Sequence, residues 1–426
     1  MSIDIAEAAG APVPAHTESG RKRSRVTPVT LLLALAGGMV LMSLVRVITG
    51  ANDIDSSGTV SATLVLAVPI AMAGLGGLWA ERAGVVNIGL EGMMIFGTWG
   101  AGFGGYQWGP WAGLVCGVLF GALGGLLHAV ATVTFTVDHI VSGVALNLLA
   151  AGLVKYLSGL AFVGKPGGGK TQSPYIDSPP SFTVPGVSDW LKDVEAKHWL
   201  FVSDLAGVVR GLTTNVSLFT ILALALVIGT FFILWRTAFG LRLRSCGESP
   251  VAAESLGVNV YRYKYAAVIA SGAFAGFGGV YLAEVAASIY RDGQTGGRGY
   301  IGLAAMIFGN WRPGGLLAGS TLFGYTDALQ LRRGGESVHA LLLLLALILL
   351  GIVVWRVLRR ANVASTLVAA ACAVGLFVWY ATTTAVPDDF TGMTPYVATL
   401  LVLSLSAQRL RMPAADGLPY RRGEGG

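Results

Sequence analysis

Four side chains that carry charge or form strong hydrogen bonds lie within a short stretch between two apolar runs. They are Glu81, Arg82, Asn87 and Glu91. Charged and amide groups are costly to bury away from water, so in such a setting they mark a functional site or a polar pathway. Asn87 and Glu91 are four residues apart, which predicts that they share one face of a helix. This stretch is therefore the first candidate for contact with a solute.

A second pattern, Gly164 to Thr171, reads GKPGGGKT and matches the nucleotide-binding form G-x-x-x-x-G-K-[ST]. In a working nucleotide site a buried strand precedes this loop and a helix follows it, so that backbone N–H groups face the phosphates. Here an apolar run of spanning length precedes the pattern, and Pro174 and Pro179 follow it closely. We therefore interpret the segment as a flexible outer loop and not as an ATP site.

The composition indicates the environment that surrounds these groups. Only 12% of the 426 residues are charged, against about 25% in ordinary soluble domains. Apolar residues make up 54%, glycine adds 60 more, and the mean hydropathy is +0.67. These values exclude an ordinary soluble enzyme and indicate a polytopic protein in contact with a lipid bilayer.

Charge and cysteine usage narrow the function further. The net charge of +6 is modest, and the basic residues are not interleaved with aromatic ones as a nucleic-acid surface requires, so no nucleic-acid partner is expected. Cys116, Cys246 and Cys372 are far apart and follow no metal-ligand spacing. We expect no disulfide framework, no metal site and no cofactor.

Eleven apolar runs have the length that crosses a bilayer. They cover about 29–48, 60–79, 88–106, 110–135, 140–162, 216–235, 265–289, 314–331, 338–355, 364–386 and 394–408. Residues 299–309 are apolar but too short to cross alone, which predicts a re-entrant or broken helix beside a polar cavity. The expected fold is all-α, with about 10 to 11 transmembrane helices and this one interrupted piece.

Glycine recurs at helical spacing in two of these runs. Gly113, Gly117, Gly121 and Gly125 repeat every four residues, as do Gly272 and Gly276. Small residues allow helix backbones to approach closely in a membrane. The pattern predicts a tightly packed bundle.

A cytoplasmic N-terminus leaves more Lys and Arg on the inner side than on the outer side, as the positive-inside rule requires. The regions predicted on this topology are a disordered cytoplasmic segment 1–27, an additional helix in 28–57, a core 58–358, two additional helices in 359–410 and a cytoplasmic tail 411–426. Within the core, 164–215 is an outer loop and 236–264 a cytoplasmic loop. The outer loop is either an amphipathic piece lying on the bundle or a docking surface for an external partner.

Three segments in order carry a family resemblance. They are ERAGVVNIGLEGMM at 81–94, GLRLRSCGESPVAAESLGV at 240–258 and GRGYIGLAAMIFGNW at 297–311. Together they resemble the permease subunits of ABC importers in the branched-chain amino acid, ribose and nucleoside group, and most closely the nucleoside, or simple-sugar-type, branch. The resemblance covers about residues 58–355, and the additional helices at either end lie outside it.

The resemblance implies that the loop around 240–264 holds a coupling helix that sits in a groove of an ATPase. Pro250 suits the first turn of this helix and Gly257 its end. The residues assigned to coupling are Gly247, Glu248, Pro250, Ala252, Ala253, Glu254 and Gly257. Glu248 and Glu254 would make polar contacts, and the small residues would pack closely. The alternative is an ordinary basic loop at the inner membrane face.

The substrate path is assigned to polar residues at membrane depth. They are Asn87, Glu91, Asn147, Glu284, Arg298, Trp311, Asp327 and Gln330. Glu91 either accepts hydrogen bonds from a solute or pairs with Arg82 or another helix and only holds the structure together. For Asn147, Glu284, Asp327 and Gln330 the alternative, which each residue taken alone favours, is a hydrogen bond between helices. Trp311 could stack on a base and form part of a gate.

The predicted function is the passive membrane subunit of an ATP-driven importer, translocating nucleosides, with ribose or another simple sugar as the alternative. The resemblance implies a separate ATPase, a second related permease or a second copy of this chain, and an external substrate-binding lipoprotein as partners at the cell membrane. The chain itself would not hydrolyse ATP. Two functions of other classes stay open, an ion-coupled secondary transporter, which would need inverted repeats, and a structural scaffold.

Overall fold

The computed structural model describes residues 28–332, 334–360, 362–394 and 410–423. The predicted cytoplasmic segment 1–27 and nearly all of the predicted span 394–408 lie outside these residues. In the described part the chain is almost entirely helical, with one sheet of two short strands, which confirms the predicted all-α class.

In chain order the elements are α1 (Pro28–Thr49), α2 (Ser57–Arg82), α3 (Leu90–Trp108), α4 (Pro110–Ala129), η1 (Val130–Thr134), α5 (His139–Ala161), β1 (Ser181–Phe182), α6 (Val187–Glu195), α7 (Val202–Thr213), β2 (Val216–Ser217), α8 (Leu218–Arg236), α9 (Ala238–Glu248), α10 (Pro250–Ser255), α11 (Val260–Tyr281), η2 (Leu282–Ala286), α12 (Arg298–Phe308), α13 (Pro313–Leu331), α14 (Gly334–Leu358), α15 (Val363–Thr382) and α16 (Asp388–Thr391). The π-helical segments η1 and η2 continue α4 and α11 directly. Strands β1 and β2 pair antiparallel, with Ser181 opposite Ser217.

Local sequence signals set several of the helix starts. Ser56 caps α2 by accepting a hydrogen bond from the Thr59 N–H, and Asp138 caps α5 by accepting from the N–H groups of Ile140 and Val141. Such caps satisfy backbone donors that have no partner within the helix. Pro250 occupies the first turn of α10, and Gly257 follows that helix with φ +81°, as the sequence predicted.

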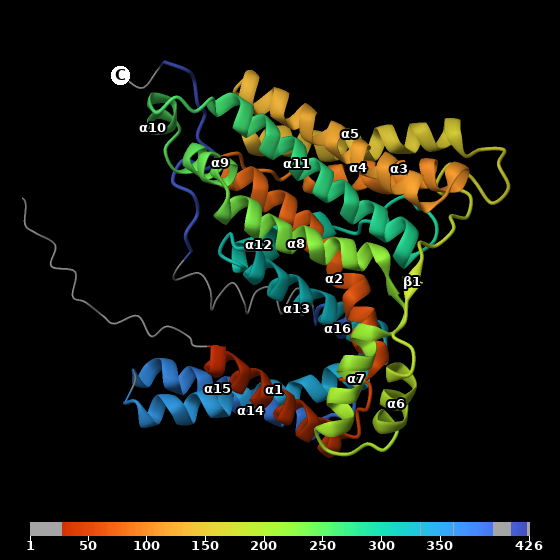
Figure 1. Cartoon of the computed structure of the whole chain (residues 1–426). Helices are drawn as coiled ribbons and strands as arrows, with labels where there is room; N and C mark the ends of the chain where they lie inside the picture. The colour runs from red at the N-terminus through yellow and green to blue at the C-terminus, as the bar shows by residue number, and fades with distance from the viewer. Residues whose placement is uncertain (1–27, 333, 361, 395–409, 424–426) are drawn as a thin grey trace, which may run out of the picture.

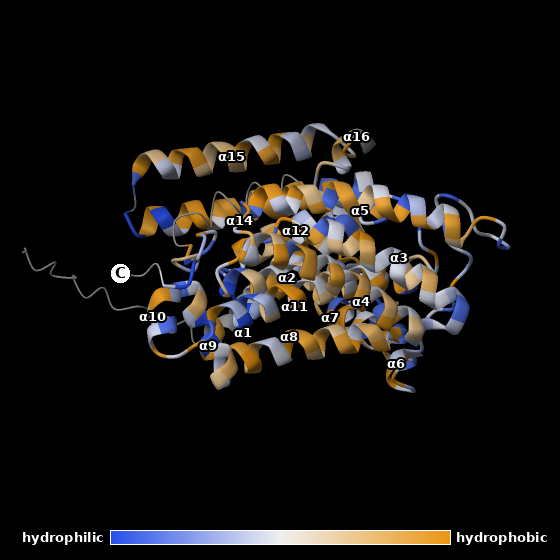
Figure 2. Cartoon of the chain, turned by 90° about the horizontal axis from the view of Figure 1, so that it is seen from above, coloured by the Kyte–Doolittle hydropathy of each residue, from blue (hydrophilic) through white to orange (hydrophobic). Residues whose placement is uncertain are grey.

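The helices run side by side between two ends of the molecule (Figure 1). One end carries α9, α10 and the C-terminal segment, and the other carries α6, α7 and the small sheet. Helices α2 and α11 lie in the middle of the bundle, where most of their side chains are buried, and α3, α4 and α13 pack around them. Helices α8, α14 and α15 lie at the periphery and show long apolar surfaces (Figure 2).

Seven of the described helices, some continued by a π segment, have both the length and the apolar composition needed to cross a membrane. They are α2, α4 with η1, α5, α8, α11 with η2, α14 and α15. Helices α3 and α13 have 19 residues each and pack in the same bundle, but they carry more glycine and polar side chains. These findings confirm a polytopic helical membrane protein.

The glycine repeats form a close contact between α4 and α11. A Cβ atom on Gly276 would lie 2.7 Å from the Gly117 carbonyl oxygen and 2.9 Å from the Gly121 Cα atom. A Cβ atom on Gly125 would lie 3.1 Å from the Gly272 Cα atom. Larger residues would force the backbones apart, so the predicted packing role of these glycines is confirmed. Gly113 differs, because a Cβ atom on it would meet the Glu284 carboxylate first and the Ala101 carbonyl oxygen of α3 at 3.0 Å.

Helix α12 is the short piece that the sequence singled out. Its 11 residues rise about 16 Å, roughly half of a hydrocarbon layer about 30 Å thick. The chain leaves its C-terminal end at Trp311, whose carbonyl oxygen accepts hydrogen bonds from Arg82 at the end of α2. Gly302 packs against Gly74 inside α2. Helix α12 therefore starts part-way through the bundle, after the non-helical segment 287–297.

Candidate functional site

Glu91 holds the N-terminal end of α12. Its Oε1 atom accepts a hydrogen bond from the Gly297 N–H at 2.9 Å, and its Oε2 atom accepts one from the Gly299 N–H at 2.7 Å. The carboxylate is 7% exposed and lies where the helix dipole favours negative charge. Of the alternatives expected for Glu91, the structure shows pairing with another helix, whereas Arg82 bonds to Trp311 at the far end of α12. A contact of Glu91 with the solute remains a prediction.

Asn87 lies beside this contact, but not on the same helix. Helix α3 begins only at Leu90, and Asn87 stands in the turn before it, where its Oδ1 atom accepts from the Gly89 N–H at 3.0 Å. Its Nδ2 group donates to the Ser271 hydroxyl of α11 at 2.8 Å. The expectation of a shared helix face was wrong, because the side chain closes the turn that precedes the helix.

Asn147 joins three elements near the start of α12. Its Oδ1 atom accepts from the Gly92 N–H at 2.7 Å, and its Nδ2 group donates to the Ile88 carbonyl at 3.1 Å and to the Tyr300 hydroxyl at 2.8 Å. All of its strong hydrogen-bonding groups therefore have partners within the chain. Its predicted place in the substrate path remains a prediction.

A cavity of about 240 Å³ opens next to the first turn of α12. Its lining includes three of the predicted substrate-path residues, Arg298, Asp327 and Gln330. The other lining residues are Gly296, Ile301, Leu331 and Gly392. Small-molecule sites commonly measure about 300 to 1,000 Å³, so the space suits a small polar solute.

The charged pair in this cavity is held loosely. The Arg298 Nη2 atom lies 3.8 Å from the Asp327 Oδ2 atom, and the two side chains are 22% and 18% exposed. Arg298 also donates to the Thr295 carbonyl at 3.2 Å, while its buried Nε atom has no hydrogen-bond partner. The cavity therefore presents a guanidinium group, a carboxylate and an amide whose hydrogen-bonding capacity is only partly used.

Glu284 lies away from this cavity. It belongs to η2, it is fully buried, and neither carboxylate oxygen has a hydrogen-bond partner. Its nearest surroundings are Gly105 of α3 and Gly113 of α4. A buried carboxylate without partners is costly, but nothing in its position connects it with Arg298 or Asp327.

The end of the bundle that carries α9 and α10 contains a second polar cluster. We call it the inner end, and the α6–α7 end the outer end, after the topology predicted from the sequence. The indole N–H of Trp311 donates to the Glu81 Oε2 atom at 2.5 Å, and Arg82 lies 3.9 Å from the Glu248 Oε1 atom. Trp311 is 3% exposed. In this conformation its indole has no free face on which a base could stack, contrary to the expectation, because the ring is packed inside the protein at the end opposite the cavity's mouth.

The predicted coupling loop folds into α9 and α10 at this inner end (Figure 1). Ala252 and Gly257 are exposed, and Pro250 is half-buried. Gly247 and Ala253 are buried inside the chain, where a Cβ atom on Gly247 would overlap the Arg82 carbonyl oxygen. These two cannot contact an ATPase directly, so any role they have in coupling acts through internal packing.

The sequence analysis treated 411–426 only as a cytoplasmic tail, but residues 410–423 pack on the coupling loop. The Ala415 N–H donates to the Gly247 carbonyl at 2.8 Å, and the Tyr420 hydroxyl donates to Glu254 at 2.7 Å. Both predicted acidic contacts of the coupling loop, Glu248 and Glu254, therefore have partners within the chain. The sequence offered one signal for this contact, the aromatic Tyr420 in an otherwise polar tail. A tyrosine that becomes buried usually needs a hydrogen-bond partner for its hydroxyl.

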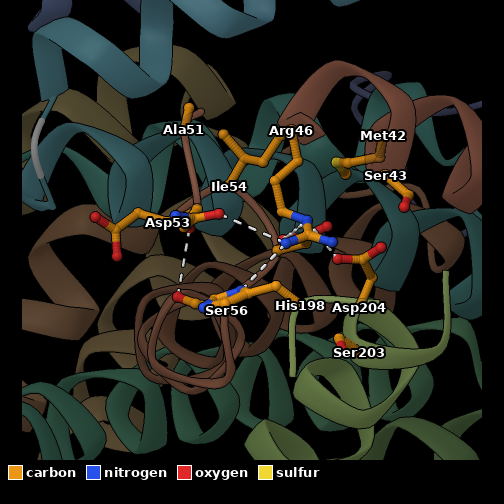
Figure 3. A network of polar contacts seen from close by, with 12 residues as sticks. Met42, Ser43, Arg46, Ala51, Asp53, Ile54, Ser56, His198, Ser203 and Asp204 are labelled. Atoms are coloured by element: carbon orange, nitrogen blue, oxygen red, sulfur yellow. Dashed lines mark hydrogen bonds and ion pairs between the residues drawn. The ribbon is translucent and has the colours of Figure 1, made fainter. Parts of the chain in front are cut away.

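At the outer end, a buried charge cluster attaches α1 to the outer hairpin α6–α7 (Figure 3). The Arg46 Nε atom lies 2.7 Å from Asp204 and 3.8 Å from Asp55. Burial and the neighbouring Asp204 raise the pKa of Asp55 to about 8, against the opposing charge of Arg46. The additional helix α1 is therefore joined to the core through specific contacts.

The outer hairpin is also fixed to the start of α2. Glu195 accepts from the Ser57 N–H at 2.8 Å and pairs with Arg210 at 2.8 Å. Burial opposes ionisation of Glu195, but these bonds hold its pKa below the ordinary value. Trp190 and Trp199 on the same hairpin are 65% and 54% exposed. The hairpin lies on the bundle as an amphipathic piece, and its use as a docking surface remains a prediction.

Comparison with known proteins gives a consistent result. Residues 59–354 match the family described as the branched-chain amino acid transport system permease component. The chain is 35% identical to the guanosine ABC transporter permease protein of Bacillus subtilis, over 86% of this chain and 97% of that protein. It is 33% identical to the nucleoside ABC transporter permease protein of Lactococcus lactis subsp. cremoris, over 84% of this chain and 94% of that protein.

A further relative, from Haloferax volcanii, is provisionally named as a glucose ABC transporter permease protein. It is 35% identical over 66% of this chain and 80% of that protein. No solved structure matches the chain. The bacterial matches extend beyond residues 59–354, so at least part of the flanking segments is shared with those proteins.

Proposed function

This chain belongs to the family of branched-chain amino acid transport system permease components, and we propose that it is the membrane subunit of an ATP-driven importer of nucleosides. The observation that carries the proposal is the match to guanosine and nucleoside permeases over nearly their whole length. The polytopic helical architecture is the one that such a subunit requires.

We assign the nucleoside-binding role to the cavity beside α12. A nucleoside offers ribose hydroxyls and base edges, which donate and accept hydrogen bonds. Asp327 accepts, Arg298 donates, and Gln330 can do both. A discontinuous helix that starts near mid-membrane beside polar groups is also the usual setting of a transporter site. The first turn of α12 and the end of α13 would then contact the solute.

In this proposal α12 is the part that moves. Its N-terminal end is held by Glu91, and its C-terminal end is held by Arg82 and Trp311, so a displacement of the inner end is carried along about three helical turns to the cavity. Movement of the coupling loop at α9 and α10 would open and close access to Arg298 and Asp327. The free energy for this movement would come from ATP hydrolysis on a separate subunit.

The proposed partners follow from the class of transporter. They are an ATPase at the α10 end, a second permease or a second copy of this chain, and an external substrate-binding lipoprotein at the α6–α7 end. The α10 end would then be cytoplasmic, in agreement with the basic residues Arg236, Arg242 and Arg244 there. The chain would sit in the cell membrane with both termini on the cytoplasmic side.

A simple sugar is the second candidate solute, favoured by the relative provisionally named as a glucose permease. Ribose and glucose offer hydroxyls but no base edge. Competition for uptake between unlabelled solutes distinguishes the two candidates. A cavity that recognises only the sugar would bind free ribose about as tightly as a nucleoside. We expect an excess of unlabelled nucleoside to block uptake and an equal excess of ribose or glucose to leave it almost unchanged.

The test of the function is uptake of labelled guanosine into proteoliposomes that contain this chain with its ATPase and second permease. We expect uptake that requires ATP, the ATPase and the external binding protein. Uptake that continues without the ATPase would favour an ion-coupled transporter. No uptake of nucleosides or sugars by the complete assembly would contradict the proposed function.

A further inference from the structure

The segment Leu410–Gly423, called the strap below, lies across the inner end of the bundle (Figure 1). It contacts the α12–α13 turn, the junction of α9 and α10, the turn after α2, and α11. These four elements are far apart in the sequence. The strap contacts all four of them.

At one end the strap binds the α12–α13 turn and the α9–α10 junction. The Arg411 N–H donates to the Asn310 Oδ1 atom at 2.8 Å. Four residues later, the Ala415 N–H donates to the Gly247 carbonyl at 2.8 Å, and the Ala414 N–H donates to Glu248 at 3.3 Å. The strap thus joins the end of the moving helix α12 to the start of α10.

At its other end the strap is anchored by Tyr420. This side chain is 8% exposed, and it packs with the buried residues Cys246, Ala253 and Val260. Its hydroxyl donates to the Glu254 Oε2 atom at 2.7 Å, and its ring centroid lies 5.5 Å from that of Tyr261. The exposed Arg422 adds an ion pair with Glu254 at 3.2 Å. A buried tyrosine with a bonded hydroxyl indicates a specific docking position.

Close backbone contact supports the same conclusion. A Cβ atom on Gly84 would lie 3.1 Å from the Gly247 Cα atom and 3.2 Å from the Ala415 carbonyl oxygen. The turn after α2, the α9–α10 junction and the strap therefore meet where only glycine leaves enough room. Between these contacts, Asp416 is buried beside Glu81, Lys264 and Arg82.

The strap changes what α10 can present to a partner. Glu254 faces the strap, and Glu248 is shared between Arg82 and the strap. Two exposed side chains in this region are apolar, Val251 at 45% and Leu256 at 84%, and Glu248 is 56% exposed despite its contacts. A direct polar contact of Glu254 with another subunit would compete with two bonds inside the chain.

We propose that the strap positions the coupling helix α10 for the ATP-hydrolysing subunit and transmits the movement of α10 to the α12–α13 turn. This inference rests on the proposed function. Glu254 is then a positioning residue that acts through Tyr420, and not a contact with the ATPase. The number of solute molecules transported for each ATP hydrolysed should depend on the strap. Without the strap, α10 could move together with the ATPase while α12 stays in place.

The first test is a truncation after Met412 in the full transporter assembly. We expect the chain to insert into the membrane and to assemble with the ATPase. The ratio of guanosine transported to ATP hydrolysed should fall about tenfold, which corresponds to the loss of one hydrogen bond to a charged group. A truncation after Gly423, which leaves the strap complete, is the matched control and should keep the ratio.

The second test is a double-mutant cycle that does not depend on the truncated chain folding. Tyr420→Phe removes one hydroxyl, and Glu254→Gln removes the charge that it binds. If Glu254 acts through Tyr420, each variant lowers the transport ratio by about three- to tenfold, and the double variant is no worse than the stronger single one. Multiplied effects would show that Glu254 acts independently of Tyr420 and would overturn its role as a residue that acts through Tyr420.

The outcomes separate the two proposals. If the full-length assembly fails to transport any solute with ATP, the proposed function is wrong. If full-length protein transports guanosine and truncation after Met412 leaves the ratio unchanged, the strap has no part in coupling. A faster transport after truncation would also overturn the inference, because it would identify the strap as an inhibitor.

Discussion

The cavity beside α12 and the inner end of the bundle both contain buried or half-buried charge, but they differ in how far that charge is paired. At the inner end, Glu81 binds Trp311, and Glu254 binds Tyr420. In the cavity, Arg298 and Asp327 approach only to 3.8 Å, and the Arg298 Nε atom has no partner. Paired groups such as Glu254 with Tyr420 hold a shape, whereas partly paired groups beside open space are available to a solute.

The two regions are connected by α12, whose ends are held in different ways. Glu91 holds its N-terminal end through two backbone N–H groups, and Arg82 holds its C-terminal end through the Trp311 carbonyl. Both contacts come from the α2–α3 region around the turn at 83–89. Helix α12 therefore connects the two regions through a contact at each of its ends, and the following variants test the two regions.

The largest effect is expected from Glu91→Ala. The change leaves two N–H groups at the start of α12 without acceptors in a buried setting, which costs about 2 to 3 kcal/mol of the free energy of unfolding. We expect uptake to be lost and the thermal unfolding midpoint of the purified protein to fall. Glu91→Gln, which keeps one acceptor, should be intermediate. A stable protein with full uptake would show that Glu91 does not hold α12.

Removing the cavity charges should be almost as severe for uptake, but not for folding. Asp327→Asn keeps the side-chain size, and Arg298→Gln removes the guanidinium group but keeps a polar side chain. Each is expected to lower uptake by about tenfold through weaker solute binding. The unfolding midpoint should stay nearly constant, because neither group is fully buried. The exposed Arg236→Gln is the control. Equal uptake in all three variants would show that the cavity is not part of the substrate path.

Gly247→Ala tests the tight packing at the inner end. Its Cβ atom would overlap the Arg82 carbonyl oxygen, so the backbone must shift at a cost of about 1 to 3 kcal/mol in the free energy of unfolding. We expect a clear loss in thermal stability together with reduced ATP-driven uptake. Gly314→Ala, where no atom lies within 4 Å of the new Cβ atom, should be nearly neutral. Equal behaviour of the two variants would contradict the close contact.

The smallest effect is expected from pH. Burial raises the pKa of Asp416 to about 7, against the charges of Lys264 and Arg82, while Glu81 faces the same group. A carboxyl whose pKa is higher when docked stabilises docking in its protonated form, so docking of the strap weakens as pH rises from about 4 through about 7. Protection of the strap amides from hydrogen exchange should decrease over this range.

Asp416→Asn is the matched variant for this measurement, because it keeps the shape and cannot ionise. We expect strap protection in Asp416→Asn to be nearly independent of pH between about 5 and 8. The same pH dependence in the wild-type protein and in Asp416→Asn would show that another group is responsible. The result distinguishes a strap held by packing alone from one held in part by a buried acid.

Local patterns in the sequence predicted several features that the structure confirms. The low charge and the long apolar runs identified a polytopic helical membrane protein. The shortness of residues 299–309 identified the broken helix α12. The glycine repeats predicted the close contact of α4 with α11. Each of these depends on residues that are near one another in the chain, so periodicity and length are enough to reveal it.

The hydrogen-bond partners of individual side chains were predicted less well, because these partners lie on segments that are distant in the sequence. Glu91 was expected to bind a solute or to pair with Arg82 or another helix, and the partner that the structure shows is the backbone of α12 at Gly297, more than 200 residues away. Trp311 was expected near the solute, but it packs against Glu81 at the inner end. The sequence did not single out these partners, and the substrate-path role of both residues remains a prediction.

The amino-acid sequence alone thus determined that this chain crosses a membrane, where its helices lie and which helix is interrupted, because hydrophobicity, helix length and glycine spacing are local properties. The tertiary structure decided that Arg298, Asp327 and Gln330 share one cavity, that Glu91 fixes the start of α12, and that residues 410–423 return to the coupling loop. Backbone N–H and carbonyl groups are the partners in many of these contacts. Every residue carries such groups, so the side-chain sequence contains no signal for which of them is used.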